Sequence, residues 1–358
     1  MKLILGSGIS GVDSTAEYVL ASFLRLRMSL SCTKVFYHWV LLKCVGGMMY
    51  IDSALGNIES MAKCLEANRL RVNEPMSLHT TIHIGGPADL FYVTETSGDL
   101  VKAVRLCRSF SVPVTVIGEG SGVLVSDKGI RGLVIYNKSE RIQVRHQRRS
   151  VGEFLRRVES KNMEVTVDSG VRLSFAIERL HSLGIKGFDS FDVYKGTVGG
   201  VVAGGLGGET LKKISIIDSH GAVRSVDSKK ELGGCVVTDA TFVLEKGEVK
   251  KKRVKKEKAK SKRQKKIVFK VFEDINEEER QIFNYPSRDV GYVIGEVLNL
   301  KGFSVGKMRV SKTNQNSIEN LGGGTAKDFV KLIEEIKRRA RESLGIELAE
   351  SVVRLGEW

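Results

Sequence analysis

The chain has 358 residues, of which 42% are hydrophobic, and a net charge of +15. This composition supports a globular protein of two or three domains. The five cysteines form no CxxC pair, which argues against a zinc site and a disulfide framework and fits a reducing compartment such as the cytoplasm. Basic residues interrupt the apolar patches of the first 50 residues, so neither a membrane span nor a secretory signal is expected.

Most of the excess positive charge lies in one segment. Residues 250–266 hold twelve basic side chains and one acid, so the rest of the chain carries only +4. The segment has no aromatic residue that could stack on bases, and we expect a solvated helix or mobile insertion. The alternative is contact with nucleic acid or another anionic surface through residues 250–266, which salt would weaken.

The chain opens, within residues 1–56, with a strand, a Gly6-x-Gly8-x-x-Gly11 turn and a helix. This layout is typical of a nucleotide-binding βα unit and is similar to the start of the amino-acid ligases of cell-wall synthesis. No second strand with an acidic residue follows at the expected spacing. The segment is therefore either a working nucleotide site or a vestigial, appended unit, and the second interpretation is favoured.

An orderly mixture of helices and strands begins at residue 57. A helix is expected over 57–68, strands on both sides of a Gly-Gly-Pro turn within 80–93, and a helix over 97–110. The apolar face of the second helix consists of Leu100, Ala103, Val104 and Cys107. Two short buried strands, 114–117 and 132–135, then flank the sequence GEGSG.

Residues 165–245 repeat this scheme with a strand, a helix over 172–184 and a hairpin that turns at His220-Gly221. The helix directs Leu173, Ile177, Leu180 and Leu183 inward and has Gly184 after its last residue. Between helix and hairpin lies YKGTVGGVVAGGLGGE (194–209), which is too poor in bulky side chains for a packed core.

The C-terminal part contains a long helix over 326–344, and a strand over 350–356 closes the chain. Thr325 and Asp328 suit a capping box at the start of this helix, and Gly345 ends it. Its apolar face consists of Phe329, Ile333, Ile336 and Ala340.

Two glycine-rich turns, 118–122 and 196–208, carry the strongest functional signal. Together they could offer many backbone N–H groups to a pyrophosphate, with Ser121 and Thr197 adding hydroxyl donors. Neither turn ends in the Gly-Lys-Ser/Thr of a P-loop. For either turn alone, an ordinary tight connection between elements is the alternative.

An ordered set of motifs resembles the UDP-N-acetylenolpyruvoylglucosamine reductases, also called UDP-N-acetylmuramate dehydrogenases. The set is TTIHIGGPADLF (80–91), VIGEGSGVLVSDKGIRGLVI (116–135), GIKGFDSFDVYKGTVGGVV (184–202), VIGEVLNLKGFSVGKMRVS (293–311) and GGGTAKDFVKLIEEIKRRARESLGIEL (322–348). The resemblance implies an α+β protein. A two-subdomain FAD-binding fold of the vanillyl-alcohol-oxidase (PCMH) type is expected over 57–245, a basic insertion over 246–270, and a C-terminal α/β substrate domain over 271–358.

The resemblance also implies tightly bound FAD, with NADPH as the reductant. The family's flavin-side motif is matched by Ile84, Gly85 and Gly86. Its Gly-x-Gly-Ser-Asn loop at the FAD diphosphate is matched by Gly118, Gly120 and Ser121, and Gly122 replaces the asparagine. Its PGTVGG motif is matched by Gly196, Thr197, Gly199 and Gly200, with Lys195 in place of the proline.

The implied reaction passes a hydride from NADPH through the flavin to the vinyl ether of UDP-N-acetylglucosamine enolpyruvate. The reaction needs a proton donor, and it needs groups that stabilise charge on the enolpyruvyl carboxylate. The family uses a serine, an arginine and a late glutamate, and this chain departs from all three. Gln281 stands at the serine position, no Tyr-Arg pair occurs between residues 218 and 247, and Ser351 stands at the glutamate position.

Glu350 and Arg288 are therefore the candidate catalytic residues, with Ser287 or Tyr285 as a substitute acid. Lys301, in a retained Lys-Gly turn, and Asn314, at the position of a family histidine, are candidate substrate-binding residues for the UDP-sugar. No metal site is indicated. The favoured function is a monomeric cytoplasmic reductase of peptidoglycan precursor synthesis. The alternative is a catalytically degenerate protein that binds FAD or a nucleotide sugar without turnover.

Overall fold

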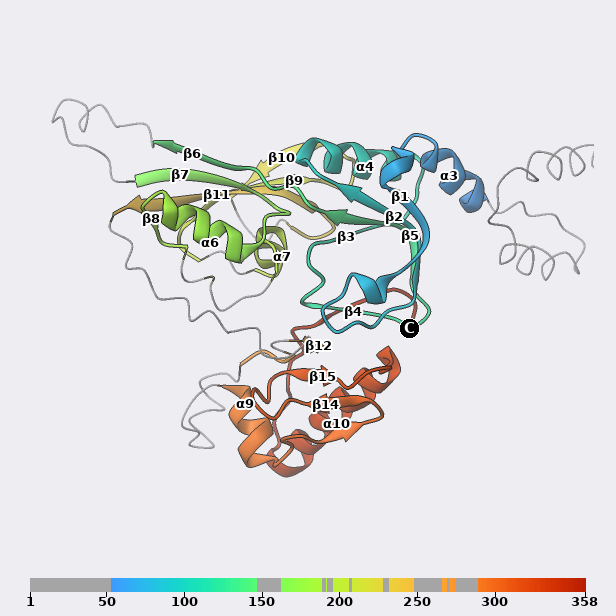
Figure 1. Ribbon diagram of the computed structural model, residues 1–358, viewed down its shortest axis with the longest axis vertical. Helices are drawn as coiled ribbons and strands as arrows, with labels where there is room; N and C mark the ends of the chain where they lie inside the picture. The colour runs from blue at the N-terminus through green and yellow to red at the C-terminus, as the bar shows by residue number, and fades with distance from the viewer. Residues whose placement is uncertain are drawn as a thin grey trace, which may run out of the picture. The chain divides into compact units, whose positions relative to one another are not determined.

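The computed structural model describes residues 53–146, 162–188, 191, 196–205, 208–227, 232–247, 266–268, 271–274 and 289–358, and Ala54–Trp358 form one compact unit (Figure 1). Several sequence-based predictions lie outside the described residues. These are the nucleotide-binding motif near the N-terminus, Lys195, nearly all of the basic segment, and the positions Gln281, Tyr285, Ser287 and Arg288.

The first subdomain is built on a sheet in the order β1-β2-β5-β3. β5 pairs in parallel with β2 and with β3, whereas β1 is antiparallel to β2. Residues 132–135 of the central strand are all buried, as expected for a parallel strand covered on both faces. The strands are β1 (Leu70–Pro75), β2 (Pro87–Thr94), β3 (Val114–Ile117) and β5 (Ile130–Asn137). The two strands predicted around GEGSG are thus confirmed, but only the second is buried, because Ile117 is the one fully buried residue of β3.

Helix α4 (Ser97–Ser109) packs on this sheet in the way the sequence predicts. The side chain of Thr96 and the carboxylate of Asp99 form a capping box at its first turn. The predicted apolar face is buried in a cluster that also contains Met61 of α3 (Ser53–Ala62). The helix expected over 57–68 is partly wrong, because α3 stops at Ala62 and the 3₁₀ turn η1 (Ala67–Arg69) leads into β1.

The strand expected before the Gly-Gly-Pro turn does not form. Thr80 Oγ1 donates to the carbonyl of Ile84 at 2.7 Å and accepts from its N–H at 3.2 Å, so a local turn satisfies these backbone groups instead of a strand partner. A second 3₁₀ turn, η2 (Met76–Leu78), precedes it. The antiparallel partner of β2 is β1, which the sequence analysis missed.

The second subdomain has an antiparallel sheet in the order β10-β9-β11-β7-β6, with β8 pairing β11. Figure 1 shows α6 and α7 against this sheet. The predicted hairpin is confirmed, because the Asp218 carboxylate accepts from the N–H groups of His220 and Ala222 in its turn. The strands are β6 (Ile142–His146), β7 (Asn162–Asp168), β8 (Ile185–Lys186), β9 (Leu211–Ile217), β10 (Val223–Val226) and β11 (Val236–Lys246).

Two expectations for the helices of this subdomain are corrected. α6 (Leu173–Ser182) ends one residue before Leu183, whose side chain is 42% exposed rather than directed inward. The glycine-dense segment does contribute to a packed core, because it forms α7 (Val198–Ala203), which buries Val198, Val201 and Val202. The intervening glycines allow α7 to pack closely, since a methyl group on Gly199 would lie 2.6 Å from Ser169 Cβ.

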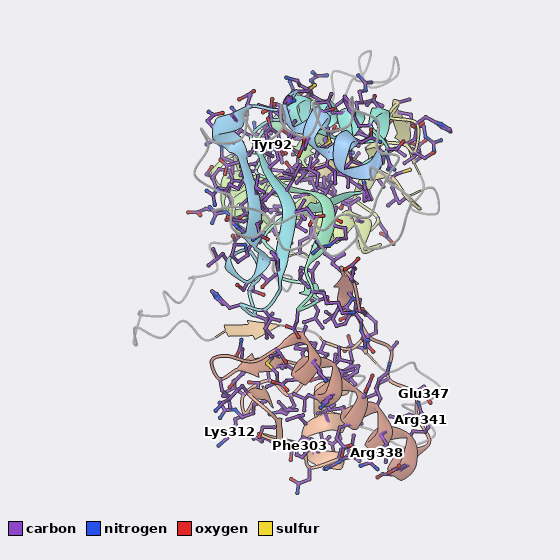
Figure 2. The ribbon with its side chains drawn as sticks, turned by 90° about the vertical axis from the view of Figure 1, so that its right-hand side faces the viewer. Tyr92, Phe303, Lys312, Arg338, Arg341 and Glu347 are labelled. Atoms are coloured by element: carbon purple, nitrogen blue, oxygen red, sulfur yellow. The ribbon has the colours of Figure 1, made fainter. Side chains whose placement is uncertain are left out.

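The C-terminal module has a small antiparallel sheet in the order β12-β15-β14-β13, covered by α10 (Ala326–Leu344). The predicted capping box of α10, its buried face and its end at Gly345 (φ +68°) are all confirmed. Near its C-terminal end, Arg341 and Glu347 face one another and form an ion pair (Figure 2). The remaining elements are β12 (Lys266–Val268), α9 (Val290–Tyr292), the π-helical turn η5 (Val293–Val297), β13 (Ser304–Val305), β14 (Met308–Val310) and β15 (Ile318–Asn320).

The chain end returns to the first subdomain. The strand expected over 350–356 is shorter, β16 (Val353–Leu355), and pairs in parallel with β4 (Val123–Val125). Two residues of the 80–86 turn, Ile82 and Ile84, are buried in the apolar cluster of the C-terminal module. Within the part of the chain that the structure describes, no helix is long and apolar enough to cross a membrane, and no three potential ligands gather into a metal site.

Candidate functional site

The loop 118–122 connects β3 to β4 and requires its glycines. Gly120 has φ +63°, and a side chain there would overlap the carbonyl oxygen of His79 and lie 2.9 Å from Thr80 Cα. The N–H and the hydroxyl of Thr81 both donate to the carbonyl of Gly120, at 3.1 and 3.4 Å. The loop is thus held tightly against the turn that contains the predicted flavin-side motif.

The second glycine-rich turn meets this loop. A methyl group on Gly118 would lie 2.5 Å from Thr197 Oγ1, and one on Gly196 (φ +125°) would lie 2.7 Å from Ser121 Oγ. The two turns belong to different sheets, and their backbones approach each other closely. A residue with a side chain at Gly118 or Gly196 would prevent this approach. We call residues 118–122 and 196–200 together the glycine junction.

The two halves of the glycine junction differ in the hydrogen-bond donors that they leave free. Val198 and Gly199 donate their N–H groups to the carbonyls of Val171 and Ser169, at 2.9 and 2.8 Å, and Gly200 donates to Thr197 Oγ1. The expectation that both turns offer many amides is therefore wrong for the 198–200 part. In the loop, by contrast, the N–H groups of Glu119, Gly120 and Gly122 donate to no described residue.

These free amides fit an anionic group such as the diphosphate of FAD. Successive N–H groups around a left-handed residue form a concave site for an anion, and Gly122 has no neighbour within 4 Å of where a methyl group would lie. A group approaching this loop therefore meets backbone donors and no bulky side chain at position 122. The roles of Gly118, Gly120, Ser121, Gly122, Gly196, Thr197, Gly199 and Gly200 in FAD binding remain predictions.

The predicted flavin-side motif lies between the loop and the C-terminal module. Gly86 donates its N–H to the carbonyl of Ser126 at 2.8 Å, and the side chain of Ile84 is only 2% exposed. Ile84 therefore packs into the core, and its N–H and carbonyl are already bonded to Thr80 Oγ1. The Gly85 N–H donates to no described residue and is the group that this motif can present to a cofactor. Asn320 of the C-terminal module donates to the Ile82 carbonyl at 2.9 Å and fixes this turn.

The C-terminal strand brings the candidate catalytic carboxylate into the neighbourhood of the loop. Val353 donates its N–H to the carbonyl of Gly122 at 3.0 Å, so Ser351, at the family's glutamate position, lies two residues from this contact. Glu350 itself is bound by Lys337 Nζ and Arg354 Nη2, each at 2.9 Å from Oε1.

The Glu350 carboxyl is held in its ionised form. Partial burial opposes ionisation, but the hydrogen bonds from Lys337 and Arg354 prevail and lower the pKa of Glu350 below its ordinary value. A carboxylate with two cationic partners is a poor proton donor, so Glu350 is suited to electrostatic positioning rather than to acid catalysis. Its partner as a candidate catalytic residue, Arg288, lies outside the described residues.

The two candidate substrate-binding residues occupy exposed loops of the C-terminal module. Lys301 begins the turn before β13, and Asn314 lies in the loop between β14 and β15. A methyl group on Gly302 would lie 3.1 Å from Lys312 Cε, so the first turn contacts the start of the second loop. Asn314 Oδ1 accepts from the N–H of Asn316 at 3.1 Å, and its side-chain Nδ2 donates to no described residue and can bind a ligand.

Sequence reasoning missed two charged residues at the glycine junction. Arg172 Nε lies 3.9 Å from Glu119 Oε1, so a guanidinium and a carboxylate face one another beside the free amides. Glu119 lies between the first two glycines of the GEGSG loop and Arg172 directly precedes α6, and neither position carries a recognisable signal in the sequence. Only the fold brings the two residues together.

Comparison with known proteins agrees with this arrangement. A family model described as FAD binding domain matches residues 88–232, and one described as UDP-N-acetylenolpyruvoylglucosamine reductase, C-terminal domain, matches residues 270–355. The crystal structure of UDP-N-acetylenolpyruvylglucosamine reductase from Thermus caldophilus is similar with a TM-score of 0.55 at 23% identity, covering 80% of this chain and 99% of that one. The predicted α+β fold, with an FAD-binding domain and a C-terminal domain of this type, is thus confirmed.

Two curated relatives extend the similarity over nearly their whole length. The UDP-N-acetylenolpyruvoylglucosamine reductase of Lachnoclostridium phytofermentans is 29% identical over 327 residues, which is 84% of this chain and 97% of the relative. That of Syntrophomonas wolfei is 30% identical over 311 residues, which is 82% of this chain and 97% of the relative. The chain therefore belongs to the UDP-N-acetylenolpyruvoylglucosamine reductase family.

Proposed function

We propose that the protein is an FAD-dependent reductase that uses NADPH to reduce UDP-N-acetylglucosamine enolpyruvate to UDP-N-acetylmuramate, a precursor of peptidoglycan. The observation that carries the proposal is the glycine junction, where three amides of the 118–122 loop have no hydrogen-bond partner among the described residues. Such a loop suits the FAD diphosphate. Bound FAD would supply the hydride-carrying centre between NADPH and the vinyl ether.

The chain's own residues then have distinct tasks. The amides of Glu119, Gly120 and Gly122 bind the diphosphate, and the exposed Lys301 and Asn314 side chains orient the UDP-sugar. The ionised Glu350, fixed by Lys337 and Arg354, positions the two cations near the chain end that contacts the loop. These cations are available to balance negative charge that develops on the substrate carboxylate.

The proton donor is proposed to be Ser287 or Tyr285, because an amide such as that of Gln281 is a very poor acid. Measuring flavin reduction and flavin reoxidation separately in variants of the two residues identifies the donor. Ser287→Ala or Tyr285→Phe should leave the reduction of flavin by NADPH unchanged and slow its reoxidation by the enolpyruvyl substrate by about 100-fold or more. If both variants reoxidise at the normal rate, neither residue is the donor.

The proposed activity is tested with the purified protein and added FAD under anaerobic conditions. NADPH should bleach the flavin absorbance, and UDP-N-acetylglucosamine enolpyruvate should restore it with formation of UDP-N-acetylmuramate. A protein that binds FAD but whose reduced flavin is not reoxidised by this substrate would be the non-catalytic alternative. No separate observation favours that alternative. Failure to bind FAD would exclude the reductase and would leave only a protein that binds a nucleotide sugar without turnover.

A cytoplasmic, monomeric protein is part of the proposal. The substrate is a nucleotide sugar and the reductant is NADPH, both of which are cytoplasmic metabolites. The basic segment is proposed to take no part in the reaction. Its last residue, Lys266, belongs to β12. Gel filtration combined with light scattering should give the mass of one chain, and a larger mass would contradict the monomer.

A further inference from the structure

Arg172 and Glu119 form an ion pair that the fold does not need. Arg172 Nε lies 3.9 Å from Glu119 Oε1, and their side chains are 57% and 37% exposed. A pair this exposed and this loosely spaced contributes little to folding stability. Both side chains are therefore free to change partner when a charged ligand arrives.

The backbone directs the Arg172 side chain toward the loop. Arg172 pairs with Thr197 in an isolated antiparallel bridge, closed by hydrogen bonds from Leu173 to Gly196 at 3.0 Å and from Val198 to Val171 at 2.9 Å. Two residues opposite each other in such a bridge project their side chains to the same face. Since the Thr197 hydroxyl lies against Gly118, Arg172 projects toward the loop as well.

Tyr136 lies close to both charged groups. It pairs with Ile117, the last residue before the loop. Burial raises the pKa of the Tyr136 hydroxyl, the Glu119 carboxylate raises it further, and the Arg172 guanidinium opposes both. A phenol on the end of β5 thus lies within electrostatic reach of both charged groups.

Glu119 and Arg172 should have opposite effects on the binding of a diphosphate at this loop. A diphosphate beside three free amides is repelled by the Glu119 carboxylate, and a guanidinium binds phosphate oxygens in a bidentate manner. Position 122, a glycine with open space around it, contributes no side-chain donor. Among the described residues, Arg172 is a cation that projects toward this loop and can supply the side-chain donor that position 122 lacks.

We propose that Arg172 binds the diphosphate of FAD, and that Glu119 lowers the affinity by competing for the same guanidinium. In the absence of cofactor Arg172 pairs with Glu119, and on binding it exchanges the carboxylate for the phosphates. This assignment rests on the proposed function, because it requires that FAD occupies the glycine junction. It adds a side chain from the second subdomain to a site formed chiefly by the backbone of the first.

The proposal is tested by titrating the full-length apoprotein with FAD and following flavin fluorescence. Arg172→Gln should raise the Kd for FAD by about tenfold or more, and Glu119→Gln should lower it by about threefold. The double variant should fall between them. Arg179→Gln, which removes an exposed arginine from α6, the helix that follows Arg172, is the matched control and should bind FAD as the unchanged protein does.

Riboflavin separates a phosphate contact from a structural effect. Because riboflavin has no phosphate, its affinity should be the same in the Arg172→Gln variant and in the unchanged protein. Equal FAD affinity of the Arg172→Gln and unchanged proteins would overturn the assignment while leaving the proposed function intact. An equal loss of FAD and riboflavin binding would also overturn it, since that pattern indicates distortion of the junction. If the unchanged protein binds no FAD, the proposed function fails and the assignment fails with it.

Discussion

The glycine junction and the C-terminal catalytic positions both depart from the family's motifs, but the departures have different consequences. At the junction the replaced residue is Gly122, and the free amides that remain belong to the backbone. At the predicted catalytic positions, Gln281 and Ser351 would replace side chains whose acidity and charge carry out the reaction. A site made of main-chain groups tolerates a change of side chain, whereas a site made of titratable side chains does not.

The largest effect is expected from a change that breaks the backbone of the junction. Gly120→Ala places a methyl group against the His79 carbonyl at φ +63°. We expect a loss of about 2 kcal/mol or more in the free energy of unfolding, and a loss of FAD binding. Thermal unfolding and flavin titration measure the two effects.

Gly122→Ala is the matched control in the same loop. No heavy atom lies within 4 Å of its added methyl group. It should change the stability by less than about 0.5 kcal/mol and retain FAD binding. Equal effects of the two alanines would contradict a junction held by close backbone approach.

A smaller effect is expected at the contact between the C-terminal module and the flavin-side turn. Asn320 is 8% exposed, donates to the Ile82 carbonyl and accepts from the N–H groups of Gly322 and Gly324. Asn320→Ala should cost about 1–2 kcal/mol of the free energy of unfolding, because it leaves buried groups without partners. Denaturant unfolding measures this cost.

Asn320→Asp separates the two sides of this contact. It keeps an acceptor for Gly322 and Gly324 but removes the donor to Ile82. We expect a loss of FAD affinity with the 320–324 turn preserved. A variant that unfolds as Asn320→Ala does but binds FAD normally would show that the turn, and not its contact with residue 82, is what Asn320 stabilises.

The ion pairs of Glu350 predict a dependence of stability on pH. Because the pKa of Glu350 is lowered in the folded protein, its contribution is complete above the ordinary value of 4.5 and is lost as the pH falls through the lower, folded value. Glu350→Gln should therefore be less stable than the unchanged protein at neutral pH, by about 1–2 kcal/mol. The difference should shrink as the pH falls below about 4. Chemical denaturation at a series of pH values measures the free energy of unfolding of both proteins. A difference between them that does not change with pH would contradict the ion pairs of Glu350.

The smallest effect is expected from deleting residues 250–265. The segment contains most of the excess charge, yet we place no part of the reaction there. The Kd for FAD and the turnover rate should stay within about twofold of the unchanged protein. A large loss of FAD affinity or of turnover would show that the segment is needed for the reaction. Salt-sensitive binding of nucleic acid that disappears on deletion would support the alternative role.

Local signals predicted the elements that local physics determines. The capping boxes of α4 and α10, their apolar faces and the turn at His220-Gly221 all depend on residues within a few positions of each other. Such contacts are readable from spacing alone. The prediction failed at 80–86, where one Thr80 hydroxyl satisfies the backbone of Ile84, and at Leu183, where the helix ends a residue early.

The site was predictable only in part, for the same reason. The glycines of the two turns could be found in the sequence, but which amides remain free depends on Val171 and Ser169 accepting bonds from the second turn. The pairing of β16 with β4, which returns the chain end to the loop, and the approach of Arg172 to Glu119 are likewise long-range. The spacing of residues in the sequence does not predict contacts between residues so far apart in the chain.

The most direct test of the account is the equilibrium binding of FAD and of riboflavin to the unchanged apoprotein. A diphosphate bound by the amides of the loop predicts one FAD per chain, with a Kd of about 1 µM or lower and an affinity at least about 100-fold above that for riboflavin. Absence of FAD binding, or equal affinity for the two flavins, would contradict the claim that the glycine junction binds the cofactor through its diphosphate.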